Sequence, residues 1–160
     1  MSDRLRTKVD ETLELYAAKG VFMSFSSVLR SNKGANYRMK WHKDRFYDLV
    51  FDAVKHSLRF PVVLPKVPRP MYEAFKKFVA KRQSEETIAH RRIDPKKVRI
   101  SCSLKNGNIS LLFIAKDRDY EYATQKLIHL MHEVFLIFLR DGLYYEYTIK
   151  TFDLDRDQMS

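Results

Sequence analysis

The pair Asn106-Gly107 constrains the fold of this 160-residue chain more than any other feature. Asn-Gly between two apolar runs is the strongest short-range signal for a β-hairpin, because both residues tolerate the positive φ angles of a two-residue turn. Apolar positions before the pair alternate with polar ones and are Val98, Ile100, Cys102 and Leu104. The run 109–115 after the pair is apolar on both faces, which is typical of a central strand. An antiparallel hairpin is therefore expected in the C-terminal third.

Apolar spacing elsewhere predicts helices and further strands. Spacings of three and four residues predict amphipathic helices over 2–19, 44–59, 70–86 and 119–140. Segment 21–42 predicts a second hairpin with a turn at Gly34, a residue free to adopt positive φ. A short apolar run at 60–65 has prolines at both ends and fits an edge strand. A tyrosine-rich strand is expected at 143–152.

These elements predict one α+β domain in which helices pack on an antiparallel β-sheet. The expected order is an N-terminal helix (2–19), a basic block (21–65), a linker and helix (66–96), a second block (97–152) and an acidic tail (153–160). The two blocks share the order ββαβ without residue-level identity. A chain of this length buries enough surface to fold without a disulfide or metal.

Composition excludes several classes of protein. Cys102 is the only cysteine, so no internal disulfide can form and a reducing compartment is favoured. No apolar run resembles a signal peptide core or approaches the ~20 residues of a membrane span. The four glycines fall at predicted turns or helix ends, which leaves none for a phosphate-binding loop. We expect a cytoplasmic protein that binds no cofactor.

No catalytic or metal site emerges from the motifs. His129 and Glu133 lie four residues apart on the predicted helix, but their order is not His-Glu-x-x-His and no third ligand is nominated. Both fall opposite the apolar stripe, so we expect an exposed pair. Cys102 is in phase with an apolar face and is expected to be a buried thiol. Segment 153–157 begins like a calcium loop but lacks its glycine and final glutamate. The sequence predicts a non-enzymatic protein.

The net charge is +10, and its distribution indicates one type of partner. Residues 1–50 carry +4 and residues 51–100 carry +8, whereas residues 101–160 carry −2. A polyanion would therefore meet the first two-thirds of the chain, although a basic surface can also serve solubility alone. Candidate polyanion-binding residues are Arg38, Lys40, Lys43, Arg45, Arg91, Arg92, Lys96 and Lys97.

Apolar surplus near the C-terminus indicates a different partner. The predicted helix 119–140 is apolar nearly all round in its second half, and the predicted strand 143–152 carries aromatics on both faces. Apolar surface in excess of what a small core can bury commonly marks an interface. The alternative explanation is that these side chains belong to a larger core. Candidate interface residues are Leu136, Tyr144, Tyr145, Tyr147 and Phe152. We expect a protein-binding module that self-associates. The alternative is nucleic-acid binding without sequence preference through residues 30–99.

Overall fold

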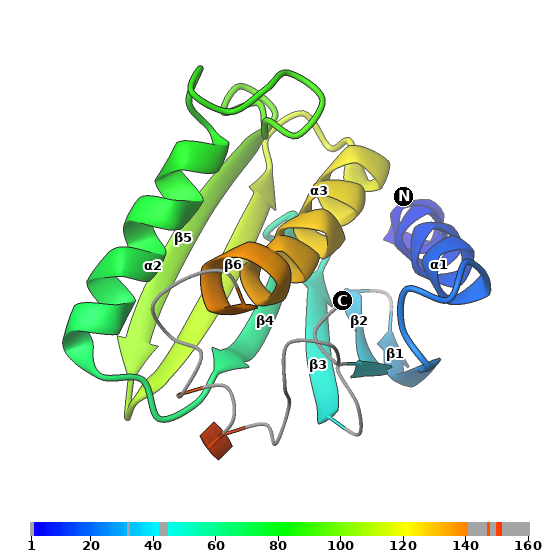
Figure 1. The fold of residues 1–160 in the computed structure, drawn as a ribbon. Coiled ribbons are helices and arrows are strands. Elements are labelled where there is room, and N and C mark those ends of the chain that lie inside the picture. Colours follow the sequence, from blue (N-terminus) through cyan, green and yellow to red (C-terminus); the bar gives the residue numbers. More distant parts are fainter. Residues whose placement is uncertain (1, 32, 42–44, 141–146, 148–149, 152–160) are drawn as a thin grey trace.

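Helices and strands of the chain form one sheet with helices packed on it (Figure 1). The computed structural model describes residues 2–31, 33–41, 45–140, 147 and 150–151, apart from the side chains of 2–7, 28–31 and 140. The predicted α+β class is confirmed. The elements in chain order are α1 (Ser2–Ala18), β1 (Ser24–Ser31), β2 (Gly34–Trp41), β3 (Arg45–Asp52), β4 (Ser57–Leu64), α2 (Arg69–Arg82), β5 (Val98–Lys105), β6 (Asn108–Ala115), α3 (Tyr120–Glu133) and a π-helix, η1 (Val134–Arg140).

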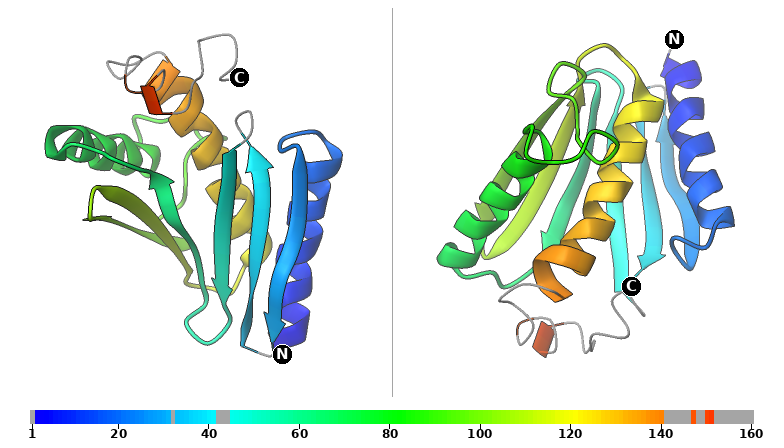
Figure 2. Two further views of the ribbon diagram at one scale, coloured as in Figure 1. Left: turned by 90° about the horizontal axis from the view of Figure 1, so that it is seen from below. Right: turned by 45° about the horizontal axis from the view of Figure 1, so that its top comes forward.

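The six strands pair antiparallel in the order β1-β2-β3-β4-β6-β5. Helices α1, α2 and α3 lie on the same face of this sheet, as the views in Figures 1 and 2 show. We call the face beneath the helices the inner face and the opposite one the outer face. Burial follows this division, because inner residues such as Tyr37 and Leu49 are fully buried while their neighbours Arg38 and Asp48 are exposed.

The predicted C-terminal hairpin is confirmed. Asn106 and Gly107 adopt φ angles of 54° and 80°, as a two-residue turn of mirror-image type requires. Lys105 pairs with Asn108, so the turn holds only these two residues. The inner residues of β5 and β6 contribute to the core, and β6 lies between β4 and β5 as a central strand.

The predicted helix over 44–59 is wrong. Its apolar residues fit a helical period, but Tyr47, Leu49 and Phe51 also recur at every second position, and aromatic and β-branched side chains favour strands. The segment forms β3 and the start of β4. Asp52 makes the reversal between them, because its carboxylate accepts hydrogen bonds from the amides of Val54 and Lys55 at 2.9 and 3.1 Å.

Three further expectations change with this finding. The described residues of block 21–65 form four strands and no helix, so the two blocks do not share a ββαβ order. The predicted edge strand at 60–65 is instead part of β4, an interior strand that ends at Leu64, and Pro61 is tolerated there because the register shifts between Phe60 and Leu64. Within 143–152, the described residues Tyr147, Lys150 and Thr151 are helical rather than extended. The rest of that segment lies outside the described residues.

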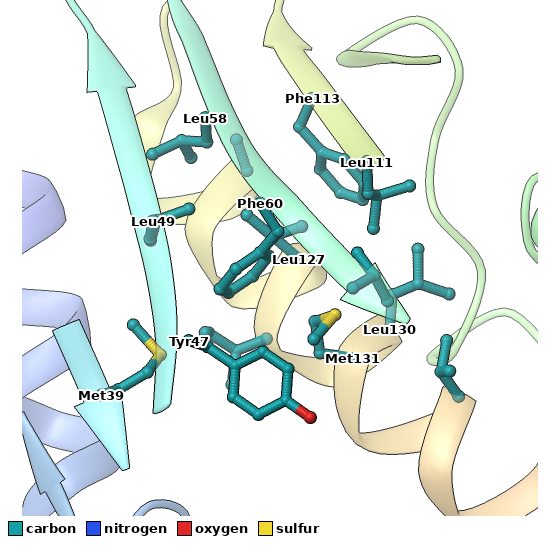
Figure 3. Close-up of a cluster of buried hydrophobic side chains, with 14 of the residues drawn as sticks. Met39, Tyr47, Leu49, Leu58, Phe60, Leu111, Phe113, Leu127, Leu130 and Met131 are labelled. Carbon is teal, nitrogen blue, oxygen red and sulfur yellow. The ribbon is translucent and has the colours of Figure 1, made fainter. Parts of the chain in front are cut away.

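The core forms where β3, β4 and β6 face α3. Figure 3 shows Leu49, Phe60 and Phe113 of these strands meeting Leu127 and Met131 of α3. The Asp119 carboxylate caps the start of this helix by accepting a hydrogen bond from the Tyr122 amide at 3.0 Å. Among the described residues, no helix is long and apolar enough to cross a membrane.

Candidate binding pocket

A pocket of about 660 Å³ opens between α1 and α3 on the inner side of the sheet. We call it the α1–α3 pocket. Its volume lies within the range typical of ligand-binding sites. Five separate segments line it with Tyr16, Gly20, Val21, Met23, Trp41, His90, Arg91, Ile128, His129, His132, Glu133, Leu136 and Ile137.

The wall beside α1 is set by the way this helix ends. Gly20 adopts a φ of 78°, which turns the chain out of the helix, and its neighbour Val21 donates an amide hydrogen bond to the Tyr16 carbonyl. Met23 then donates to the Lys40 carbonyl at 2.8 Å. This bond ties the connector to the end of β2 and brings Met23 close to Trp41.

The floor of the pocket is aromatic and apolar. Trp41 is only 4% exposed, and its ring packs edge-on against Phe22 and Tyr47 at centroid distances of 5.5 and 6.3 Å. Ile128 of α3 is also buried. A rigid floor of this kind can hold an apolar group with little loss of side-chain freedom.

The His129 side chain is exposed, as the sequence predicts, but its ring also contacts α1. Its Nε2 and the Tyr16 hydroxyl lie 3.0 Å apart in a hydrogen bond, and the two rings meet edge-on. Partial burial lowers the pKa of His129, and nearby Lys126, His132 and Lys19 lower it further. The imidazole is therefore neutral at neutral pH.

Glu133 does not form the exposed pair with His129 that the sequence predicts. Its Oε2 lies 2.9 Å from Arg82 Nε, and both side chains are largely buried, at 14% and 12% exposed. The ion pair joins α3 to the end of α2 and neutralises the carboxylate of Glu133. Three histidines line the pocket, but among the described residues no group of histidine, cysteine and carboxylate side chains could hold a metal.

The rim is basic because Arg91 is exposed on the loop between α2 and β5. This loop is tied on both sides. The Arg92 guanidinium donates to the Thr87 carbonyl at 3.1 and 2.9 Å, and Lys126 of α3 donates to the His90 carbonyl at 3.2 Å. An apolar floor and a cationic rim suit a ligand that carries an apolar body and a negative group.

The second half of the long helix also contributes to the pocket. The α-helical pattern of α3 ends at Glu133, and Val134–Arg140 continues as a π-helix. Leu136 and Ile137 of this segment line the pocket. Short π-helical segments are frequent at functional sites, which is consistent with a role for this part of the helix in binding.

The structure divides the predicted polyanion-binding residues between the two faces of the sheet. Arg38 and Lys40 point to the outer face, as the alternation along this strand predicts, whereas Arg91 opens into the α1–α3 pocket. Arg92 and Lys96 line a second hollow, of about 580 Å³. Lys97 lies 3.5 Å from Asp119, Arg45 begins β3, and Lys43 lies outside the described residues.

The predicted interface residues are only partly described. Leu136 lines the pocket, and the Tyr147 hydroxyl donates a hydrogen bond to the Pro65 carbonyl. Tyr144, Tyr145 and Phe152 lie outside the described residues. Sequence reasoning missed the pocket because its walls come from segments more than 100 residues apart, and only the direction of Trp41 was predictable.

Cys102 is half-buried on the inner side of β5, near α2. Burial raises the pKa of its thiol to about 11, so the thiol is protonated at neutral pH and a poor nucleophile. Comparison with protein-family models, curated proteins and solved structures finds no match. Function must therefore follow from the geometry.

Proposed function

We propose that this chain is a non-catalytic protein-binding module whose α1–α3 pocket takes a short segment of a partner protein. That segment places a bulky apolar side chain on the Trp41 floor and an acidic residue beside Arg91. The proposal depends on one observation, the apolar floor and basic rim found together in the pocket. Interfaces concentrate their binding energy where an apolar anchor fills a pocket of this kind.

The pairing of the polar lining residues supports a role without catalysis. A nucleophile or general base works beside a group that orients it. Here the described partner of His129 is the Tyr16 hydroxyl, whose own pKa is raised by burial. The Glu133 carboxylate is engaged by Arg82. These contacts support a structural role for both residues.

A polypeptide fits this surface better than a small molecule does. Met23 lines the pocket and is 65% exposed, and Ile88, two residues before His90, is 55% exposed. Exposed apolar side chains next to an apolar pocket favour an occupant that extends beyond it. A chain segment covers such residues, whereas a ligand confined to the pocket leaves them in water.

An acidic partner is favoured over a second copy of this chain. Leu136 lines the pocket, so self-association there would bury it, as the sequence leads us to expect. The chain carries a net charge of +10, however, and its pocket rim is basic, so two copies repel each other. Sedimentation at micromolar concentration distinguishes the two partners. A dimer that Leu136→Gln dissociates would replace our proposal with self-association.

The decisive experiment is a peptide-display selection against the full chain. Trp41 is the only tryptophan, so its emission reports directly on the pocket floor. We expect enriched peptides to combine a bulky apolar residue with Asp or Glu and to shift this emission. Arg91→Glu should weaken their binding about tenfold, since it reverses a charge close to the ligand.

Arg69→Glu is the matched control, because Arg69 is an exposed cation in the first turn of α2 and does not line the pocket. An acidic residue is also favourable at that helix end, so the variant should fold. Peptides that bind Arg91→Glu as tightly as wild type would contradict the proposal. So would binding of 1-anilinonaphthalene-8-sulfonate, a small aromatic anion, with no peptide enriched.

A further inference from the structure

The outer face of the sheet is a second surface, separate from the α1–α3 pocket. Helices α1, α2 and α3 lie on the inner face, so none of these three covers the outer side chains (Figure 2). Strand register places these side chains in rows that cross the sheet. One such row runs through Asn36, Val50, Arg59, Leu112 and Ser101.

Charge on the outer face is mainly positive. Its described acidic residues are Asp48 and Asp52, and Asp52 is engaged in the turn between β3 and β4. Its described cations are Arg38, Lys40, Arg59, Arg99 and Lys105. They come from β2, β4 and β5, so they extend across the sheet rather than clustering on one strand. A flexible polyanion that crosses the strands would meet several of them.

Phe46 is the unusual residue on this face. It lies on the solvent side of β3 and is 59% exposed, although most phenylalanine side chains of the described chain are buried. Lys40 is its cross-strand partner in β2, and Arg38 lies two residues before Lys40. The Lys40 ammonium and the Arg38 guanidinium carbon each lie 6.0 Å from the centre of the Phe46 ring.

An ion pair fixes one side of this cluster. Arg38 Nε donates to an oxygen of Asp48 at 2.9 Å and Nη2 to the other at 3.4 Å, so the guanidinium stays beside the ring. An exposed aromatic ring next to cations is the combination on which single-stranded nucleic acids stack, because bases meet the ring and phosphates meet the cations. The sequence did not predict this cluster, because its apolar spacing placed Phe46 on a helix over 44–59.

We propose that the outer face binds single-stranded nucleic acid without sequence preference, with one base stacked on Phe46 and the backbone following Lys40 and Arg59. Arg59 lies two strands from Lys40 and four residues away along the strand direction, which is roughly 16 Å for ordinary strand spacing and rise. That separation is in the range of two to three nucleotides of an extended strand. Duplex DNA is disfavoured because its bases are already stacked and cannot reach the ring.

Fluorescence anisotropy of a labelled 12-nucleotide DNA strand of mixed sequence tests the proposal. We expect wild-type binding to weaken from 50 to 200 mM salt, with a log–log slope of about −0.7 per phosphate contact. Phe46→Ala should weaken binding about tenfold at either salt concentration, because it removes a stacking contact and no charge. Phe46→Tyr should retain binding. Lys40→Gln and Arg59→Gln should each weaken binding and flatten the slope.

Two controls separate the site from general attraction to a basic protein. Lys77→Gln removes one exposed charge from α2, on the opposite side of the sheet, and should change the affinity less than twofold. Val54→Ala removes an exposed apolar residue from the β3–β4 turn and serves as the match for Phe46→Ala. Circular dichroism of each variant confirms folding.

Three results would overturn the proposal. These are no binding at 50 mM salt, equal binding by wild type and Phe46→Ala, and binding of inorganic polyphosphate as tight as that of the DNA strand. Polyphosphate carries negative charge but no bases. If it bound as tightly as the DNA strand, the outer face would be a general polyanion site rather than a nucleic-acid site. The pocket proposal stands apart from these outcomes, because Arg91 and Trp41 lie on the other side of the sheet.

Discussion

The side chains around His129 illustrate how a single residue can acquire a specific environment from distant segments. Tyr16 comes from α1, while Lys126 and His132 flank the imidazole on α3 itself. Lys19 approaches from the end of α1 and lies 6.0 Å from the centre of the Tyr16 ring. Partial burial and the three neighbours Lys126, His132 and Lys19 all oppose protonation of this imidazole. The folded state therefore favours its neutral form.

This environment predicts how stability depends on pH. The pKa of His129 is lower in the folded chain than its ordinary 6.5, so the unfolded chain binds more protons as the pH falls below 6.5. Protonation therefore destabilises the folded state, and the penalty is complete below the folded pKa. We expect His129→Gln, which still hydrogen-bonds, to lose less stability than wild type between pH 7 and pH 5.

Urea unfolding followed by Trp41 emission measures this effect. His90→Gln is the matched variant, since it removes an exposed imidazole from the rim of the same pocket. If wild type and His129→Gln lose equal stability over this pH range, the assignment of the neutral form to the folded state is wrong.

Individual elements depend on close backbone contacts as well as on apolar faces. Gly34 begins β2 and pairs with Asp52 of β3. Among the described glycines, Gly20 and Gly107 adopt positive φ angles and Gly34 does not. The position of Gly34 therefore does not require the positive φ that the sequence predicts. A Cβ atom there would lie 2.1 Å from the Phe51 carbonyl oxygen, so the strands approach too closely for a side chain.

We therefore expect Gly34→Ala to destabilise the chain by about 1–3 kcal/mol, the usual cost of forcing extra atoms into a packed site. The backbone of β3 must move to accept the methyl group. Asn36→Ala, two residues along the same strand, should cost well under 1 kcal/mol. Urea unfolding of both variants provides the measurement, and equal stabilities would show that β2 and β3 can separate without cost.

The sequence predicts local elements well and their assembly poorly. The β5–β6 hairpin and the helices α1, α2 and α3 depend on neighbouring residues, so their sequence patterns suffice to predict them. Segment 44–59 fits both a helical and a strand period, and only pairing with β2 and β6 decides between them. The exposed position of Phe46 follows from that pairing, and the α1–α3 pocket follows from the packing of segments that are distant in sequence, so neither was predictable.

At the scale of the whole molecule, one buried cluster joins all the elements. Inner residues of β2 to β6 meet α1, α2 and α3 in it, and Figure 3 shows its centre. The pairing of β4 with β6 unites the N-terminal four strands with the C-terminal hairpin, because β5 contacts β6 alone. This continuity predicts that the chain unfolds as one unit.

Substitutions in β6 test this prediction through a distant reporter. Phe113 is fully buried, and Phe113→Ala should cost about 3–5 kcal/mol, while Ile109→Val should cost about 0.5–1.5 kcal/mol and leaves a folded chain for comparison. Trp41 lies in β2, three strands away from β6. We expect its emission and far-ultraviolet circular dichroism to report one urea midpoint in each variant. Separate midpoints would indicate two independent units.

The described sheet ends at β1 and β5, and both outermost strands discourage the addition of another strand. In β1 the register shifts between Ser27 and Leu29, which interrupts the row of regular pairing. In β5 the outward side chains include Arg99 and Lys105, whose like charges oppose a second copy. Sheet-to-sheet polymerisation is thereby disfavoured at high concentration. A partner is then left with the two faces of the sheet, so recognition by this chain depends on side chains rather than on backbone pairing.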